Sequence, residues 1–116
     1  MNRESAVFLS GAQLPVEDLG GGISLQMLGF NDNIMMVKVI FSTGSEGYLH
    51  HHVHSQVTYV ESGEFEVTVG DETRTMVAGD SYYVAPNVEH GAVCKKAGVL
   101  LDVFSPLRED FLEGGN

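Results

Sequence analysis

Apolar and polar side chains alternate along much of the chain, in short runs separated by glycines. Phe65, Val67 and Val69 alternate with acidic or hydroxyl residues, and a similar run ends at Val77. A period of two is typical of strands that bury one face, and many closely spaced short strands are typical of a sandwich or a barrel. The strands that this pattern predicts are Ile23–Leu28, Asn33–Phe41, Tyr48–His52, Gln56–Glu61, Glu64–Val69, Glu72–Val77, Ser81–Val84, Gly91–Lys95 and Val99–Phe104.

Turn residues predict how some of these strands are connected. Ser62-Gly63 and Gly70-Asp71 each lie between two alternating runs, so we expect two consecutive tight hairpins that form a meander. Helical character is confined to the C-terminal end, where Ser105 suits an N-cap, Pro106 suits the first turn, and residues 107–112 suffice for a turn or two. We therefore expect an all-β fold with a short C-terminal helical turn.

Length and composition limit the chain to one domain. Its 116 residues suit a single domain over residues 1–116, and 43% hydrophobic residues are enough for one closed core. Sixteen acidic residues against six basic ones give a net charge of -10, which repels phosphate backbones and anionic lipid headgroups. We therefore exclude nucleic acid and membrane surfaces as partners. A small anionic ligand would need a local cation, such as Arg108 or a metal.

The single cysteine gives no sign of an oxidising compartment. Cys94 cannot form an intramolecular disulfide, and we expect it to be a small buried thiol. The N-terminal residues have too short an apolar stretch for a signal peptide, and no run approaches the ~20 apolar residues of a membrane-spanning helix. We expect a cytoplasmic protein.

Four of the five histidines lie within five residues, between positions 50 and 54. In an extended segment alternate side chains face the same side, and one face then carries His50, His52, His54, Gln56 and Thr58. Imidazole is the commonest protein ligand for transition metals, so this face predicts part of a metal site. His51 lies on the opposite face, and we expect it at the surface.

The spacing of these residues resembles the two sequence motifs of cupins. The first motif covers residues 44–63, begins at Gly44, and has Gln56 in place of the usual glutamate. The second covers residues 79–90, from Gly79 to His90, with Pro86 one place later than usual. The resemblance implies a single-domain cupin fold, a small double-stranded β-helix barrel that is jelly-roll-like.

The same resemblance implies one divalent transition metal, Ni, Zn, Mn or Fe. Its ligands would be His50, His52 and His90, with Gln56 in the place of the glutamate. Because a glutamine carbonyl is neutral, the charge of the ion would stay uncompensated, which favours capture of an anionic substrate and a Lewis-acid role. His54 is the rival ligand for the place of Gln56.

Asp102 interrupts an otherwise apolar strand. It shares a face with Leu100 and Phe104, so it is either an outward residue or an inward group with a chemical role. Burial in an apolar lining would raise its pKa and suit it to proton transfer near neutral pH. From the residues alone, the two interpretations are evenly balanced.

The pattern around Asp102 is similar to that of the pectin-degradation cupins, which open 4,5-unsaturated uronate monosaccharides. The match covers His-x-His with a downstream Gln, Pro-Asn-Val-x-His-Gly, and the C-terminal segment from Asp102 to Phe111. The resemblance implies that Asp102 and Arg108 are catalytic and that Phe104 binds substrate. Thr58, on the face of Gln56, is a further candidate for substrate binding.

The function implied is metal-dependent ring opening followed by tautomerisation to a linear ketouronate, in pectin or alginate breakdown. Asp102 would transfer the protons, Arg108 would grip the substrate carboxylate, and Phe104 would pack on the sugar. The alternatives are a metal-dependent dioxygenase, which would bind O2 at the same site, and a non-catalytic sugar-binding or sensor barrel. Small cupins commonly dimerise, and the apolar segment Ala6–Leu9 could pair with a neighbour's sheet edge, so we expect a homodimer.

Overall fold

The computed structural model describes residues 3–112, and these form antiparallel strands followed by one short helix. The expected all-β fold is confirmed. Within the described residues, no helix has the length and apolar character needed to cross a membrane. The elements are β1 (Glu17–Gly20), β2 (Ile23–Asn31), β3 (Ile34–Phe41), β4 (Glu46–His50), β5 (Ser55–Val69), β6 (Glu72–Val77), β7 (Ser81–Val84), β8 (His90–Ser105) and α1 (Glu109–Leu112).

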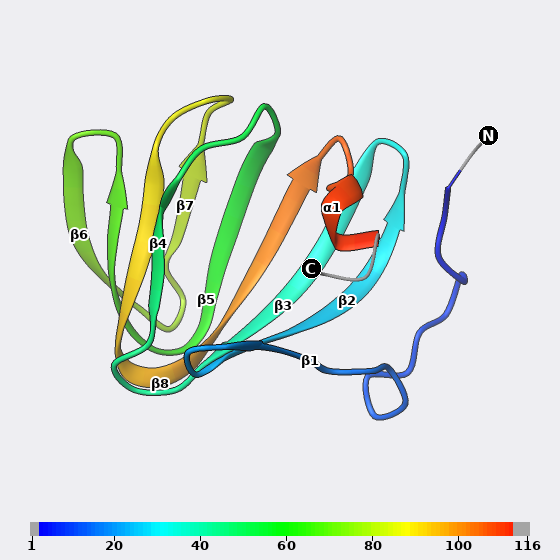
Figure 1. Cartoon of the computed structure of the whole chain (residues 1–116), viewed down its shortest axis with the longest axis horizontal. Helices are drawn as coiled ribbons and strands as arrows, with labels where there is room; N and C mark the ends of the chain where they lie inside the picture. The colour runs from blue at the N-terminus through cyan, green and yellow to red at the C-terminus, as the bar shows by residue number, and fades with distance from the viewer. Residues whose placement is uncertain (1–2, 113–116) are drawn as a thin grey trace.

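The two longest strands, β5 and β8, pair with each other along almost their whole length. The first half of β5 pairs with β7 and with the last part of β8, from which the sheet continues through β3 and β2 to β1. The second half of β5 pairs with β6 and with the first part of β8, which also pairs with β4. These are the first and second walls of the fold, and they diverge from a common base in Figure 1.

A close approach of two glycines marks the place where β5 and β8 pass from one wall to the other. Gly63 has a φ of +84°, and a Cβ on it would lie 2.6 Å from the Cα of Gly98. The register between β5 and β8 shifts around Ser62. The expected hairpin at Ser62-Gly63, and the meander built on it, are therefore wrong, because this glycine bends a continuous strand. For the same reason the strands expected at 91–95 and 99–104 are the single strand β8.

Other local predictions divide between confirmed and wrong. The hairpin at Gly70-Asp71 is confirmed, because it connects β5 to β6. β4 ends at His50, so residues 51–54 are not the extended segment that the alternation argument assumed. Ser105 is the last residue of β8 and the helix begins only at Glu109, so the expected N-cap is wrong.

The core between the walls consists of two apolar clusters. One surrounds Phe65, Val60 and Cys94, each completely buried, and the expected burial of the cysteine is confirmed. The other surrounds Met35 and Val37, with Phe111 and Leu112 of α1 packed against it. Full burial of a large apolar side chain stabilises the fold by roughly 1.5–3 kcal/mol. The helix therefore closes the first wall at its open end, beside the site described below.

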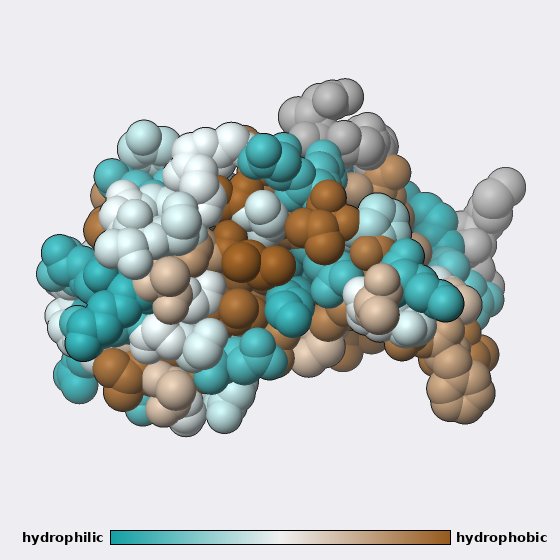
Figure 2. Space-filling view, turned by 90° about the horizontal axis from the view of Figure 1, so that it is seen from below, coloured by the Kyte–Doolittle hydropathy of each residue, from teal (hydrophilic) through white to brown (hydrophobic). Residues whose placement is uncertain are grey.

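The outer side of the first wall carries exposed apolar side chains. Val57, Tyr59, Tyr83 and Met36 are all exposed, and the register places Val57 between Tyr83 and Val103. We call these five residues the outer apolar face. Figure 2, which views the molecule from below, shows apolar groups gathered in the middle of that side of the molecule. Faces of this kind on soluble proteins commonly mark interaction sites.

Candidate metal centre

Strand ends bring three histidines together. His50 is the last residue of β4, His90 is the first of β8, and the two are paired in register. His52 follows two residues after β4. One ring nitrogen from each of the three lies within 4.8 Å of those of the other two. Gln56, buried on β5, places its Oε1 atom 3.0 Å from His52 Nε2 and 3.1 Å from His90 Nε2.

Backbone carbonyls orient the three rings. His50 Nδ1 donates to the carbonyl of Tyr48 (2.9 Å), His90 Nδ1 to that of Val88 (2.9 Å), and His52 Nδ1 to that of His54 (3.1 Å). A neutral imidazole that donates from Nδ1 keeps a lone pair on Nε2, the arrangement found around most metal-bound histidines. Burial lowers the pKa of His52 and lowers that of His90 to about 4, so both are neutral near pH 7.

The Gln56 amide completes a set of lone pairs without protons between them. Its Nε2 donates to Thr58 Oγ1 at 2.9 Å, so its carbonyl oxygen faces the histidines. The close contacts of Oε1 with two unprotonated Nε2 atoms bring acceptors against acceptors, which a shared cation would satisfy. Three imidazoles and one carbonyl oxygen are a suitable donor set for a divalent transition metal. The residues present therefore form a divalent metal site.

His54 and His51 lie outside this donor set. His54 Nε2 donates to the carbonyl of Leu107 at 3.1 Å, and its buried Nδ1 has no hydrogen-bond partner in the described part of the chain. It is therefore not the fourth member of the group, although it ties the histidine loop to the segment before Arg108. His51 is exposed, as its position on the opposite face predicts.

Asp102 lies one hydrogen bond from the amide of the donor set. It is paired in register with Thr58, whose hydroxyl donates to Asp102 Oδ1 at 2.6 Å. Burial raises the pKa of Asp102 to about 6, although the Thr58 hydrogen bond and the charge of Arg108 act in the opposite direction. The inward orientation is the one shared with Leu100 and Phe104, both buried. A carboxyl group of this kind can both accept and deliver a proton near neutral pH.

Arg108 is held between two aromatic rings. Its guanidinium carbon lies 5.0 Å from the centroid of Phe104 and 4.4 Å from that of Phe111. Its Nε and Nη2 donate to the two carboxylate oxygens of Asp110 at 3.0 and 2.9 Å, and its side chain is only 14% exposed. Its positive charge also contributes to lowering the pKa of His90. Arg108 is therefore a packed cation facing the site rather than a surface partner of Glu109.

Two contributors to the site are absent from the sequence-based predictions. Tyr82 is paired with Thr58, and its pKa is raised by burial and by the negative charge of Asp102. Its inward orientation could have been found from the alternation along Ser81–Val84. Phe111 lies three residues after Arg108, the spacing of neighbouring side chains on a helical turn. This signal was available, but the aromatic packing on the arginine was not evident from it.

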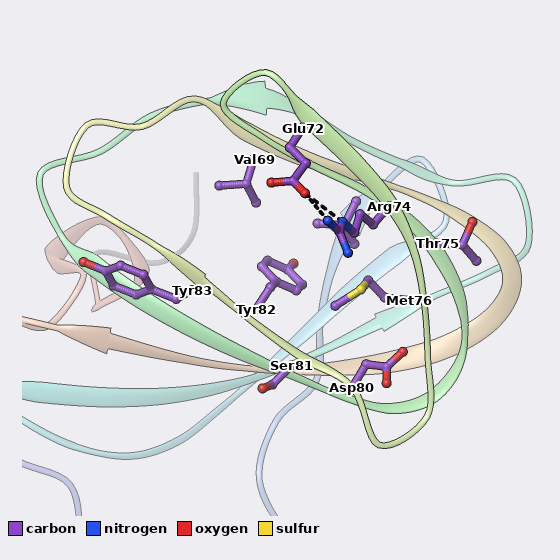
Figure 3. A pocket seen from close by; sticks show the side chains of 10 residues that line it. Val69, Glu72, Arg74, Thr75, Met76, Asp80, Ser81, Tyr82 and Tyr83 are labelled. Carbon is purple, nitrogen blue, oxygen red and sulfur yellow. Dashed lines mark hydrogen bonds and ion pairs between the residues drawn. The ribbon is translucent and has the colours of Figure 1, made fainter.

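A cleft of about 560 Å³ lies beside this site, between β6 and β7. Figure 3 shows Tyr82 projecting into it opposite Glu72, Arg74 and Met76, and Arg74 Nε donates to Glu72 Oε2 at 2.7 Å. The inner wall includes Val69, which is paired in register with His90. The cleft and the metal site therefore share neighbouring residues on β5, β7 and β8.

Comparisons with known proteins agree with this geometry. Residues 37–104 match the cupin domain family. The pectin degradation protein KdgF of Dickeya dadantii is 43% identical to this chain over 102 residues, which cover 86% of this chain and 93% of that protein.

Solved structures give the same result. An RmlC-like cupin from Shewanella frigidimarina superposes with a TM-score of 0.92 and 54% identity, over 93% of this chain and 97% of that one. KdgF from Halomonas sp. superposes with a TM-score of 0.88 and 31% identity, over 92% of this chain and 99% of that one.

Proposed function

This chain belongs to the cupin family, and from that premise we propose that it is a metal-dependent enzyme that opens the ring of 4,5-unsaturated uronate monosaccharides. The observation that carries the proposal is the combination in one site of a neutral donor set for a metal, a carboxyl group with a pKa of about 6, and a packed arginine. The product is a linear ketouronate, formed in the breakdown of pectin or alginate. The likeness to the pectin degradation protein of Dickeya dadantii supports this substrate class.

The reaction is an isomerisation that needs one proton acceptor and donor. The substrate is a cyclic hemiacetal whose ring oxygen is also an enol ether. Loss of the proton on the anomeric hydroxyl makes the C1–O5 bond break, so that C1 becomes an aldehyde and C5 carries an enol. Protonation at C4 and loss of the enol proton give the ketone at C5, so the atoms balance without an oxidant. Asp102 performs the transfers, because its pKa of about 6 lets it accept and return a proton near neutral pH.

A divalent ion bound by the three histidines and Gln56 supplies Lewis-acid polarisation of substrate oxygens. Arg108 binds the substrate carboxylate. Its guanidinium already holds the carboxylate of Asp110 in a two-bond arrangement, which is the geometry that a uronate carboxylate would adopt on the same fork. Phe104 is almost completely buried beneath that guanidinium, so we assign it the support of Arg108 and of the substrate edge nearby.

We also propose that the protein forms a homodimer through the outer apolar face. The N-terminal segment supports a second copy as the partner, because Val7 and Phe8 are 89% and 91% exposed. Val7 also lines a cleft of about 410 Å³ that reaches Met36 and Val103 of that face. An exposed arm that continues into an exposed apolar face offers two complementary surfaces on one chain, which a two-fold arrangement can bury together.

The test of the enzymatic proposal is NMR spectroscopy of 4,5-unsaturated galacturonate incubated with the metal-loaded protein. We expect the vinyl proton at C4 to disappear and signals of a linear ketone to grow, without uptake of oxygen. Oxygen consumption would favour the dioxygenase, and saturable binding without turnover would favour the sugar-binding barrel. Either of those results would refute the proposed reaction.

A further inference from the structure

One buried hydroxyl connects the metal donor set to Asp102. Thr58 is 0% exposed and lies between the side chains of Gln56 and Asp102. Its Oγ1 atom accepts from Gln56 Nε2 at 2.9 Å and donates to Asp102 Oδ1 at 2.6 Å. The second distance is typical of a hydroxyl that donates to a charged carboxylate.

The three groups have only one consistent arrangement of protons when Asp102 is ionised. A carboxylate can only accept, so Thr58 must give its single proton to Asp102. The Thr58 oxygen is then free to accept, and the Gln56 amide must turn its N–H toward Thr58. The carbonyl oxygen of Gln56 therefore faces His52 and His90, which is the orientation that a metal ligand requires.

We propose that Thr58 is a positioning residue that couples the two halves of the site: it orients the Gln56 carbonyl toward the metal and reserves Asp102 Oδ1, so that Oδ2 is the oxygen that exchanges protons with the substrate. The part that concerns Oδ2 rests on the proposed function, whereas the coupling to the metal does not. This assignment replaces direct contact with the sugar, because Thr58 has no exposed surface.

The coupling operates in both directions, as linkage requires. A cation on the Gln56 carbonyl draws electron density from the amide and makes its N–H a stronger donor to Thr58. Thr58 in turn becomes a stronger donor to Asp102, which favours the carboxylate. Metal binding should therefore lower the pKa of Asp102. The other ionisable groups that influence or face Asp102 are Arg108 and Tyr82, and neither takes part in this chain of hydrogen bonds.

The experiment compares Thr58→Val with Thr58→Ser and with Thr68→Val. Valine preserves the shape of threonine but has no hydroxyl, and serine keeps the hydroxyl. Thr68 is the matched control, because it lies on the same strand and its hydroxyl bonds Thr73 away from the site. The Zn²⁺ affinity of each protein is measured by competition with a chelator, and the Asp102 carboxyl is titrated by ¹³C NMR with and without Zn²⁺.

We expect Thr58→Val to weaken Zn²⁺ binding about threefold to tenfold, the usual effect of one hydrogen bond. We also expect Asp102 in this variant to titrate at a higher pH and to lose its response to Zn²⁺. Thr58→Ser should restore both properties, and Thr68→Val should change neither. Unchanged Zn²⁺ affinity and Asp102 titration in Thr58→Val would overturn the coupling.

Two features keep the test decisive. If Thr58→Val does not fold, the parent protein alone still decides, because an Asp102 pKa that does not fall when Zn²⁺ binds contradicts the coupling. None of these measurements uses a sugar. Failure to open a uronate would therefore refute the proposed function while leaving the coupling standing, and the reverse result would leave the function standing.

Discussion

Asp102→Asn is expected to lower turnover and to raise stability in the same protein. The carboxamide oxygen can still accept the Thr58 hydrogen bond, so the local packing is kept. The group can no longer accept or return a proton, and the loss of a positioned acid–base group lowers turnover by ~10²-fold or more. The metal donors are unchanged, so metal content should equal that of the parent protein.

The gain in stability follows from the pKa of the buried carboxyl. The pKa rises from 3.8 to about 6 on folding, and at about 1.4 kcal/mol per pH unit this difference corresponds to about 3 kcal/mol. Between these two values the folded parent holds a proton that the unfolded chain has released, so its stability falls as the pH rises through this window. Asparagine has no such proton. The variant should therefore match the parent near pH 4 and exceed it by up to about 3 kcal/mol above pH 7.

The assay combines kinetics with urea unfolding of the metal-free proteins at pH 4, 6 and 8. We expect the stability difference to appear between pH 4 and 6 and to stay constant above that. The parent should also show a rise in kcat/KM with a midpoint near pH 6, although metal binding would move it lower. Equal stability at pH 8, or unchanged turnover, would refute the inward, desolvated carboxyl on which the proton transfers depend.

Three further predictions concern the metal, the substrate carboxylate and the dimer. His50→Ala should lose most of the bound metal by elemental analysis, whereas Gln56→Glu should tighten metal binding and weaken that of an anionic substrate, because it neutralises part of the charge of the ion. Arg108→Ala should raise KM at least tenfold with a smaller effect on kcat, while Arg74→Ala, which removes an exposed arginine of β6, should leave both nearly unchanged. Tyr83→Glu, at an outer position with 60% exposure, should convert a dimer to a monomer in sedimentation velocity, and a parent protein that is already monomeric would contradict the dimer.

The sequence was most informative where a pattern has a local cause. Alternation located most strands to within a few residues, and motif spacing identified the three histidines that the structure brings together. It failed at Gly63, because a glycine between two alternating runs is equally compatible with a hairpin and with a bend. Which of the two forms depends on Gly98, 35 positions away, whose backbone packs against it. Only the tertiary fold supplies that contact.

Tertiary contacts also decide the roles of the polar residues. The alternation argument placed His54 and Gln56 on one face and could not choose between them. The strand break after His50 sends His54 toward Leu107, whereas Gln56 stays on β5 facing the histidines. Thr58 was grouped with residues that contact substrate, since alternation predicts the side that a residue faces but not whether neighbours enclose it.

The charge of the site is opposite to the charge of the chain, and Gln56 is responsible for much of that difference. The chain carries a net charge of -10, but charges farther away than ~8 Å are largely screened at physiological ionic strength. Within that distance, three imidazoles and one amide leave the charge of a divalent ion uncompensated, and Arg108 adds another positive charge. Asp102 removes only one. A glutamate at position 56 would neutralise a further unit at the place where the substrate binds, so selection for an anionic sugar depends on an uncharged side chain.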